Sequence, residues 1–327
     1  MKYKTVPAMP SVNFSTIGFG CWALGKGSGW RDSSNRRSIA AVHKALDCGV
    51  TFFDTAPIYG FGVSESLLGV ALKGRRNEIT LASKCGLVWD ESKAVRRDLS
   101  YSAVRADVEA SLRRLQIDHL DILQLHWPDH ATSLEETARA LQELIKEGKI
   151  KAVGVSNFSL SDTRALAALI PLGSYQGLYN MLERNPDRYH GIPLEYRTEE
   201  EILPYCLEKG MAFLPYSPLF QGLLTGSFKA DSQFGKDDIR SANPKLSGPA
   251  YATYFATCEE LKKVATEAGI SMTHLALAWL WRNLAVTSIL CGVQRPEQIA
   301  DNAKAADVVL TDDVLNNIEQ ILRKHNL

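Results

Sequence analysis

Hydrophobic and polar positions follow two alternating patterns along the chain. Short apolar runs are typical of buried strands, and longer stretches with apolar residues every three or four positions are typical of helices. The strand pattern occurs at residues 15–20, 51–55, 78–86, 120–127, 150–158, 174–180, 211–219 and 286–292. The helical pattern occurs at residues 38–50, 64–74, 103–115, 134–149, 162–170, 199–210, 254–269, 272–283, 295–305 and 311–324. Strands and helices are therefore expected to alternate through most of the chain.

This alternation predicts an α/β protein with parallel strands, because a helix between two strands returns the chain to the same end of the sheet. Eight such units in 327 residues match a closed (β/α)8 TIM barrel. We expect one domain over residues 1–327, with a short N-terminal β segment and a long polar loop after the seventh strand, at residues 221–247. No Pro-, Gly- or Ser-rich linker divides the sequence.

The main alternative is an open, doubly wound sheet that binds a ligand where the strand order reverses. Residues 18–23 (GFGCWA) match the glycine pattern G-x-G-x-x-A that such folds use. That pattern needs a helix to begin within it, whereas residues 24–35 have the composition of a loop. We therefore favour the barrel.

Charge and cysteine usage narrow the class of partner. Lys plus Arg and Asp plus Glu both total 37, so the zero net charge gives no sign of a nucleic-acid or membrane partner. The six cysteines are scattered without metal-type spacing. Residues 1–14 lack the apolar core of a secretory signal, and no apolar run reaches the roughly 20 residues of a membrane span. We expect a cytoplasmic protein with reduced thiols, no metal site and a small-molecule substrate.

Catalytic groups of such a barrel lie at the carboxyl ends of the strands and in the loops that follow. Four polar residues are expected there, on three consecutive strands and their loops: Asp54, Tyr59, Lys84 and His126. Each has an ordinary structural explanation when taken alone, as a turn residue, a rim aromatic, a strand terminus or a core histidine. Their convergence indicates acid–base chemistry.

The four groups suit the protonation of an oxygen that gains negative charge. A free tyrosine titrates near pH 10, and a neighbouring Lys84 ammonium would lower the pKa of Tyr59. Asp54 would keep Lys84 charged and oriented, and His126 would polarise a substrate carbonyl by a hydrogen bond. Reduction of a carbonyl by hydride from a cofactor needs a proton donor of this kind.

Six segments carry a resemblance to a known family. They are residues 49–69 (GVTFFDTAPIYGFGVSESLLG), 79–86 (ITLASKCG), 120–129 (LDILQLHWPD), 151–159 (KAVGVSNFS), 214–226 (LPYSPLFQGLLTG) and 295–302 (RPEQIADN). In this order and spacing, the chain resembles the aldo-keto reductase superfamily over nearly its whole length. Residues 59–69 and 217–228 are most similar to bacterial reductases of the inositol-catabolism type and to the potassium-channel β-subunit group.

The resemblance implies roles for the residues at the strand ends. The catalytic tetrad would be Asp54, Tyr59, Lys84 and His126, with Tyr59 as general acid. The cofactor-binding residues would be Cys21, Trp22, Asp54, Ser156, Asn157, Gln176, Tyr216, Ser217, Pro218, Leu219, Gln221, Gly222, Gly292, Gln294, Gln298, Asp301 and Asn302. Of these, Ser156, Asn157 and Gln176 would hydrogen-bond the nicotinamide carboxamide, and Tyr216 would stack on the nicotinamide ring.

The adenosine end departs from the family pattern. Many members hold the 2′-phosphate of NADP with a Lys and an Arg, where this chain has Gly292 and Gln298. Arg295 is a nearby cation, and a guanidinium can bind a phosphate through two hydrogen bonds. We therefore add Arg295 to the cofactor site and expect NADP(H), with NAD(H) as the alternative.

The substrate side is expected to be apolar. Its wall would be formed by Trp22, Tyr59, Trp89, His126 and Trp127. The tryptophan at position 127 could equally pack under its own loop. The segment at residues 221–247, which contains Arg240, would act as a flap over the cofactor.

The leading hypothesis is an NADP(H)-dependent reductase of aldehydes or ketones, which could also oxidise a sugar or polyol in reverse. One alternative is a lyase in which Lys84 forms a Schiff base, although Asp54 would keep that lysine protonated. Another is a binding subunit that senses the nicotinamide redox state for a protein partner, as in the channel β-subunit group. The pattern carries no signal for an oligomeric state.

Overall fold

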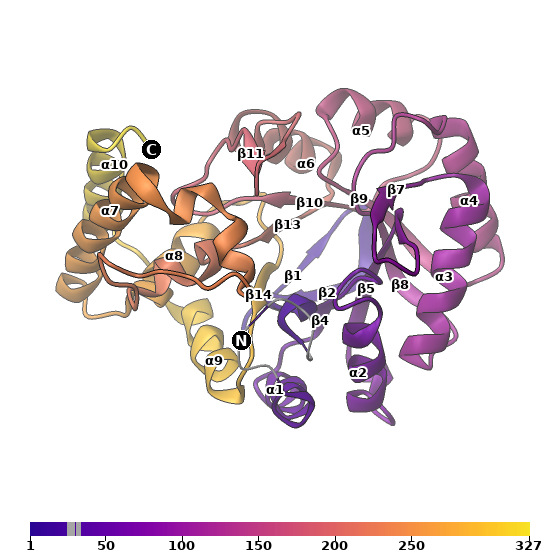
Figure 1. Ribbon diagram of the computed structural model, residues 1–327, viewed down its shortest axis with the longest axis horizontal. Coiled ribbons are helices and arrows are strands. Elements are labelled where there is room, and N and C mark those ends of the chain that lie inside the picture. Colours follow the sequence, from indigo (N-terminus) through magenta and orange to yellow (C-terminus); the bar gives the residue numbers. More distant parts are fainter. Residues whose placement is uncertain (25–29, 31–33) are drawn as a thin grey trace.

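The computed structural model describes residues 1–24, 30 and 34–327, and a ring of parallel strands forms its centre (Figure 1). In hydrogen-bonded order the strands are β13 (Ala212–Tyr216), β10 (Ser174–Leu178), β9 (Ile150–Ser156), β8 (Leu120–Leu125), β5 (Thr80–Cys85), β4 (Phe52–Asp54), β3 (Ile17–Gly20) and β14 (Ile289–Gly292). The first and last strands meet where Thr287 N donates to Phe213 O at 2.9 Å. The fold is therefore a nearly closed (β/α)8 TIM barrel, as the alternating patterns predict.

Helices cover the outside of the ring (Figure 1). They are α1 (Asn35–Asp47), α2 (Val63–Ala71), α3 (Tyr101–Leu115), α4 (Leu134–Lys146), α5 (Leu160–Ala167), α6 (Leu203–Lys209), α7 (Gly248–Glu267), α8 (Met272–Trp281), α9 (Pro296–Asn302) and α10 (Asp312–Lys324). Several begin after a serine or threonine whose side-chain oxygen accepts a first-turn N–H, among them Ser34, Ser133 and Thr311. These caps mark the helix starts in the sequence.

The interior of the ring has an apolar lower layer and a polar upper layer, because side chains alternate along each strand. The lower layer contains Phe52, Ala82 and Ile122, which belong to one buried apolar cluster. Two residues further along the same strands, toward their carboxyl ends, the buried side chains are Asp54, Lys84 and Gln124. The strand period therefore stacks the polar groups on an apolar support.

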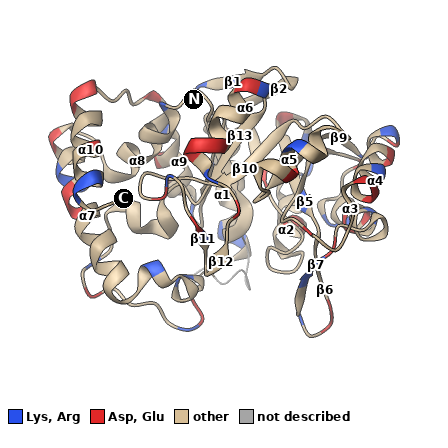
Figure 2. Cartoon of the chain, turned by 90° about the horizontal axis from the view of Figure 1, so that it is seen from above, with Lys and Arg blue, Asp and Glu red and all other residues tan. Residues whose placement is uncertain are grey.

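The described chain also contains hairpins outside the ring. The N-terminal hairpin, β1 (Tyr3–Val6) and β2 (Met9–Ser15), contributes Phe14, whose ring lies 5.0 Å from that of Phe52 between centroids. The other hairpins are β6 (Leu87–Trp89) with β7 (Val95–Arg97), and β11 (Arg188–Tyr189) with β12 (Ile192–Pro193). Figure 2 shows these two on the side of the molecule opposite β1 and β2. Their strands are too short to produce a periodic pattern.

The segment after β13 is more ordered than the expected loop. It forms short 3-10 turns at Phe220–Thr225, Ile239–Ala242 and Pro244–Leu246. The loop expected at residues 24–35 lies largely outside the described residues. Within the part of the chain that the structure describes, every helix is too short or too polar to cross a membrane.

Gly69 lets α2 approach the end of α3 closely. A Cβ atom added there would lie 2.6 Å from the carbonyl oxygen of Leu115 and 2.9 Å from that of Arg114. We expect Gly69→Ala to lower the free energy of unfolding by about 1–3 kcal/mol, because overpacking against backbone outweighs the ~1 kcal/mol that alanine gains in a helix. Urea unfolding measures this. Val70→Ala, at a position 54% exposed on the same helix, is the control. A Gly69→Ala variant as stable as the wild type would contradict the contact.

Candidate active site

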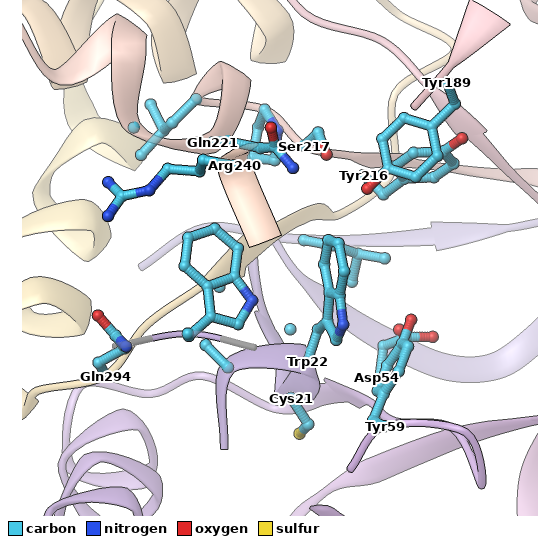
Figure 3. A pocket seen from close by; sticks show the side chains of 18 of the residues that line it. Cys21, Trp22, Asp54, Tyr59, Tyr189, Tyr216, Ser217, Gln221, Arg240 and Gln294 are labelled. Carbon is cyan, nitrogen blue, oxygen red and sulfur yellow. The ribbon is translucent and has the colours of Figure 1, made fainter. Parts of the chain in front are cut away.

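A cavity of about 590 Å³ opens at the carboxyl ends of the strands (Figure 3). Its lining runs from Tyr59 and His126, beyond β4 and β8, to Gln294 and Asn302, beside β14 and α9. Figure 3 shows Trp22, Asp54 and Tyr59 on one wall, with Tyr216, Ser217, Gln221 and Arg240 on the other. The two walls enclose an elongated space.

Most of the residues predicted for the site line this cavity. They are Cys21, Trp22, Asp54, Tyr59, His126, Trp127, Ser156, Asn157, Gln176, Tyr216, Ser217, Pro218, Leu219, Gln221, Gly222, Gly292, Gln294, Gln298, Asp301 and Asn302. Lys84, Trp89 and Arg295 lie outside the lining. Lys84 is fully buried behind Tyr59, Trp89 packs edge-on against Phe61, and Arg295 is exposed before α9.

The floor of the cavity is a hydrogen-bonded chain from Asp54 to Tyr59. Lys84 Nζ donates to Asp54 Oδ2 at 2.6 Å and to Tyr59 Oη at 3.2 Å. The other carboxylate oxygen of Asp54 accepts from Gln124 Nε2 at 3.0 Å and Gln176 Nε2 at 2.9 Å. Asp54 is 3% exposed and Lys84 is 0% exposed, so water does not compete for these bonds. Both charges are therefore held in one geometry.

Tight turns hold Tyr59 over the end of β4. Its N–H donates to Ala56 O at 3.1 Å, and Gly62 N donates to Pro57 O at 2.7 Å. Gly60 and Gly62 have φ angles of 62° and 91°, a region open to glycine because it lacks a Cβ atom. The stiff loop therefore returns the tyrosine ring toward the strand end instead of releasing it into solvent.

Burial shifts the pKa values of Tyr59, Lys84 and His126. It raises the pKa of Tyr59 well above its usual value, and the Asp54 carboxylate adds to this effect. The sequence predicted a lowered pKa for Tyr59, whereas burial and Asp54 place its net pKa above the usual value. Burial lowers the pKa of Lys84, with Asp54 acting in the opposite direction. Burial and the Lys84 charge lower the pKa of His126 well below its usual value. Near neutral pH the cavity therefore holds a protonated phenol beside a neutral imidazole.

Asn157 forms hydrogen bonds that link His126 to two tyrosines. Its Nδ2 donates to His126 O at 3.2 Å, and its Oδ1 accepts from Tyr196 Oη at 3.1 Å and Tyr216 Oη at 2.9 Å. Its φ of 62° is left-handed, which asparagine tolerates better than most residues. The His126 ring lies edge-on to Tyr59, with centroids 5.9 Å apart. The imidazole therefore faces the phenol across the cavity floor.

The wall after β13 is a strained turn. Ser217, Phe220 and Gln221 have φ angles of 53°, 47° and 53°. Such conformations cost about 1–3 kcal/mol each in non-glycine residues and gather at ligand-binding sites. The Gln221 amide is fixed at both ends, because its Oε1 accepts from Asn243 Nδ2 at 2.9 Å and its Nε2 lies 2.7 Å from His190 Nε2. Side chains of the protein therefore hold the turn in place.

The far end of the cavity carries amides where the resemblance implies cations. Gln298 Oε1 accepts from the backbone N–H of Gln294 at 2.8 Å and of Arg295 at 3.0 Å, so this side chain shapes the turn into α9. Among the described residues that line the cavity, Arg240 is the one with a permanent positive charge. Its guanidinium donates to both oxygens of Asp238, at 2.8 and 2.6 Å.

Two aromatic residues that sequence reasoning missed also line the cavity. Tyr189, in the hairpin of β11 and β12, packs edge-on against Tyr216 with centroids 5.2 Å apart. Trp30 packs edge-on against Trp22 at 5.7 Å, and its buried indole N–H has no hydrogen-bond partner among the described residues. Both follow strand ends, but neither segment has a periodic pattern that would reveal its path.

Three other proteins are similar in sequence to this chain over almost its full length. The chain is 36% identical over 325 residues to "Aldo-keto reductase YhdN" of Bacillus subtilis (strain 168), covering 98% of this chain and 94% of that protein. It is 33% identical over 324 residues to the "NADH-specific methylglyoxal reductase" of Escherichia coli (strain K12), covering 94% and 95%. It is 31% identical over 339 residues to a "Probable voltage-gated potassium channel subunit beta" of Arabidopsis thaliana, covering 99% and 97%.

A solved structure is also similar to this chain over almost its full length. The glycerol dehydrogenase AKR11B4 from Gluconobacter oxydans matches with a TM-score of 0.87 and 35% identity, over 99% of this chain and 95% of that chain. Residues 16–323, which include all eight barrel strands and the cavity, match the model of the Aldo/keto reductase family. The chain therefore belongs to the aldo/keto reductase family.

Proposed function

We propose that this protein is an NADP(H)-dependent oxidoreductase that reduces small aldehydes or ketones to alcohols, and oxidises a sugar or polyol in reverse, with Tyr59 as general acid. One observation carries the proposal: the buried Lys84 ammonium donates to the Tyr59 hydroxyl at 3.2 Å while it is paired with Asp54 at 2.6 Å. A phenol at this point can release its proton, because the ammonium stabilises the phenolate that remains.

His126 would orient the carbonyl oxygen of the substrate. Its ring lies edge-on to Tyr59, so a ring N–H and the phenol hydroxyl can approach the same oxygen atom. A neutral imidazole donates a hydrogen bond without carrying a charge of its own. Asn157 holds the backbone of His126 through the 3.2 Å bond to its carbonyl oxygen, which limits the freedom of the loop.

The cavity residues fit a nicotinamide dinucleotide. Ser156, Asn157, Gln176 and Tyr216 would orient its nicotinamide end, and the lining from Gly292 to Asn302 its adenosine end. The buried Trp30 N–H needs an acceptor, which an oxygen of the cofactor would provide. When bound, this cofactor supplies the hydride that reaches the carbonyl carbon.

The described lining around the catalytic end favours a small, uncharged carbonyl compound. Trp22, Leu87 and Trp127 supply apolar surface, and Tyr59 and His126 supply the polar groups. The printed activities of two relatives support the same class. One is a methylglyoxal reductase of Escherichia coli, and the other is a glycerol dehydrogenase of Gluconobacter oxydans.

A second candidate is a binding subunit that reports the nicotinamide redox state to a protein partner. The full-length similarity to the Arabidopsis channel subunit supports this binding-subunit candidate. A panel of carbonyls and polyols, followed by NADPH absorbance, separates the two. Measurable turnover supports the reductase. Very slow turnover with every compound, together with tight retention of cofactor, supports the binding subunit.

A Schiff-base lyase is disfavoured by the environment of Lys84. This lysine is fully buried and lies outside the cavity lining. Its Nζ donates to Asp54, to the carbonyl oxygen of Thr55 at 3.0 Å and to Tyr59. A nitrogen that uses all its donors as an ammonium has no lone pair to attack a carbonyl.

Tyr59→Phe removes the proposed proton donor with little change of shape. We expect kcat for carbonyl reduction to fall roughly 10²–10⁴-fold, the usual contribution of general acid catalysis. NADPH affinity, measured by fluorescence quenching, should stay near that of the wild type. Tyr101→Phe, the same change on the outer surface of the barrel in α3, is the control. Full activity of Tyr59→Phe would refute the general-acid role.

The protonation states predict how each direction depends on pH. The raised pKa of Tyr59 keeps the acid form present, and the lowered pKa of His126 keeps its ring neutral. We therefore expect kcat for reduction to be level between about pH 6 and pH 9. Alcohol oxidation needs the ionised phenol, so its kcat should rise with pH over the same range. Steady-state profiles in both directions measure this, and an acid limb for reduction at the usual histidine pKa would contradict it.

Cofactor preference can be tested at the two arginines. Arg240 lines the cavity, whereas Arg295 is exposed outside it, so we propose Arg240 as the partner of the 2′-phosphate. We expect Arg240→Gln to lower kcat/KM about tenfold with NADPH and much less with NADH, since one charge-assisted phosphate contact is lost. Arg295→Gln should affect both cofactors little. Equal losses with both cofactors in Arg240→Gln, or a wild-type preference for NADH, would reject the assignment.

A further inference from the structure

Gln124 lies beside the catalytic ion pair, in the polar layer of the barrel. It is fully buried on β8 and pairs directly with Lys84 in the parallel register of β5 and β8. Its Nε2 donates to Oδ1 of Asp54 at 3.0 Å, while Lys84 donates to Oδ2 of the same carboxylate at 2.6 Å. The two donors therefore hold opposite oxygens of one carboxylate.

Charge fixes the orientation of the Gln124 amide. The NH2 end faces Asp54, because a carbonyl oxygen in its position would be repelled by the carboxylate. This leaves Oε1 buried and without a hydrogen-bond partner among the described residues. A buried acceptor with no partner costs stability, which an apolar side chain of similar size would avoid. The favourable polar contact of this side chain is therefore its bond to Asp54.

Asp54 has a further donor that faces the ligand space. Gln176 Nε2 lies 2.9 Å from the same Oδ1, and Gln176 lines the cavity. A side chain proposed to bind the nicotinamide carboxamide can be drawn away from Asp54. Gln124 lies outside the lining, so its bond to Asp54 does not depend on what occupies the cavity.

We propose that Gln124 is a positioning residue for proton transfer, which fixes the Asp54 carboxylate so that Lys84 stays aimed at Tyr59. The role rests on the proposed reductase function. A carboxylate held at both oxygens cannot rotate about its Cβ–Cγ bond. Once that restraint is lost, the carboxylate can turn and Lys84 follows it away from the 3.2 Å contact with the phenol. Gln124 acts through Asp54 and touches neither substrate nor cofactor.

Gln124→Met tests the role, because it keeps the volume and removes the donor. We expect kcat for reduction to fall about tenfold, with the carbonyl KM and the NADPH Kd changed less than about twofold, as for a group that acts on the chemical step. Tm should change little, because the loss of the bond to Asp54 is offset by removal of the unpartnered oxygen. Ser174→Ala is the matched control: it removes another fully buried barrel oxygen that has no partner among the described residues, and kcat should not change.

Gln124→Glu adds a readout that a structural role would not move. Its carboxyl can donate to Asp54 only while protonated, and two adjacent carboxylates resist ionising together. The kcat of this variant should therefore approach that of the wild type at low pH and fall as pH rises. An equal loss at every pH, matching Gln124→Met, would overturn the positioning role.

A crystal structure of Gln124→Met gives a measurement that does not depend on turnover. With cofactor bound, so that Gln176 is drawn away from Asp54, the distance from Lys84 Nζ to Tyr59 Oη should exceed about 3.5 Å, beyond hydrogen-bond reach. An unchanged contact overturns the proposal, and so does a fall in Tm large enough to explain the lost activity. If the wild type reduces no carbonyl, the reductase proposal fails, while this structure still decides the role of Gln124.

Discussion

The buried charge of Lys84 is the constraint on which the site depends. An ammonium removed from water costs several kcal/mol unless it is paired and all its donors are used. Asp54 offsets that cost at 2.6 Å, and the carbonyl oxygen of Thr55 and the hydroxyl of Tyr59 accept the other N–H groups. Lys84 can therefore move only if the whole group moves with it. The Tyr59 hydroxyl becomes a fixed point in the cavity for the same reason.

The barrel makes this arrangement possible through the period of two along its strands. Phe52 lies in the apolar lower layer, and two residues later Asp54 lies in the polar layer above it. A slip of one residue would turn Phe53 into the barrel and Asp54 toward the helices. The pairing of Asp54 with Ala82 on β5 therefore sets the strand register and also places the Asp54 carboxylate inside the barrel.

The sequence predicted most of the fold and the centre of the site, for one physical reason. The carboxyl ends of parallel strands lie at the same end of a barrel. Strand positions alone were therefore enough to predict that Asp54, Lys84 and His126 lie close together. Arg240 was expected only as part of a flap, whereas the structure places it in the cavity lining. The path of a long loop depends on packing that has no period, so the sequence pattern could not show this. Tyr189 was missed because a hairpin of two-residue strands leaves no pattern.

The charge of a neighbouring residue does not by itself predict the direction of the Tyr59 pKa shift. From the sequence, a neighbouring ammonium implied a lowered pKa, but depth of burial cannot be read from a list of neighbours. Burial and Asp54 together raise it. This does not remove the catalytic use of Lys84. A neutral phenol gains little from an ammonium 3.2 Å away, whereas a phenolate formed at the same point gains a great deal in a site with little water. The interaction therefore strengthens as charge develops, which is the condition for an interaction to accelerate a reaction instead of merely binding its reactant.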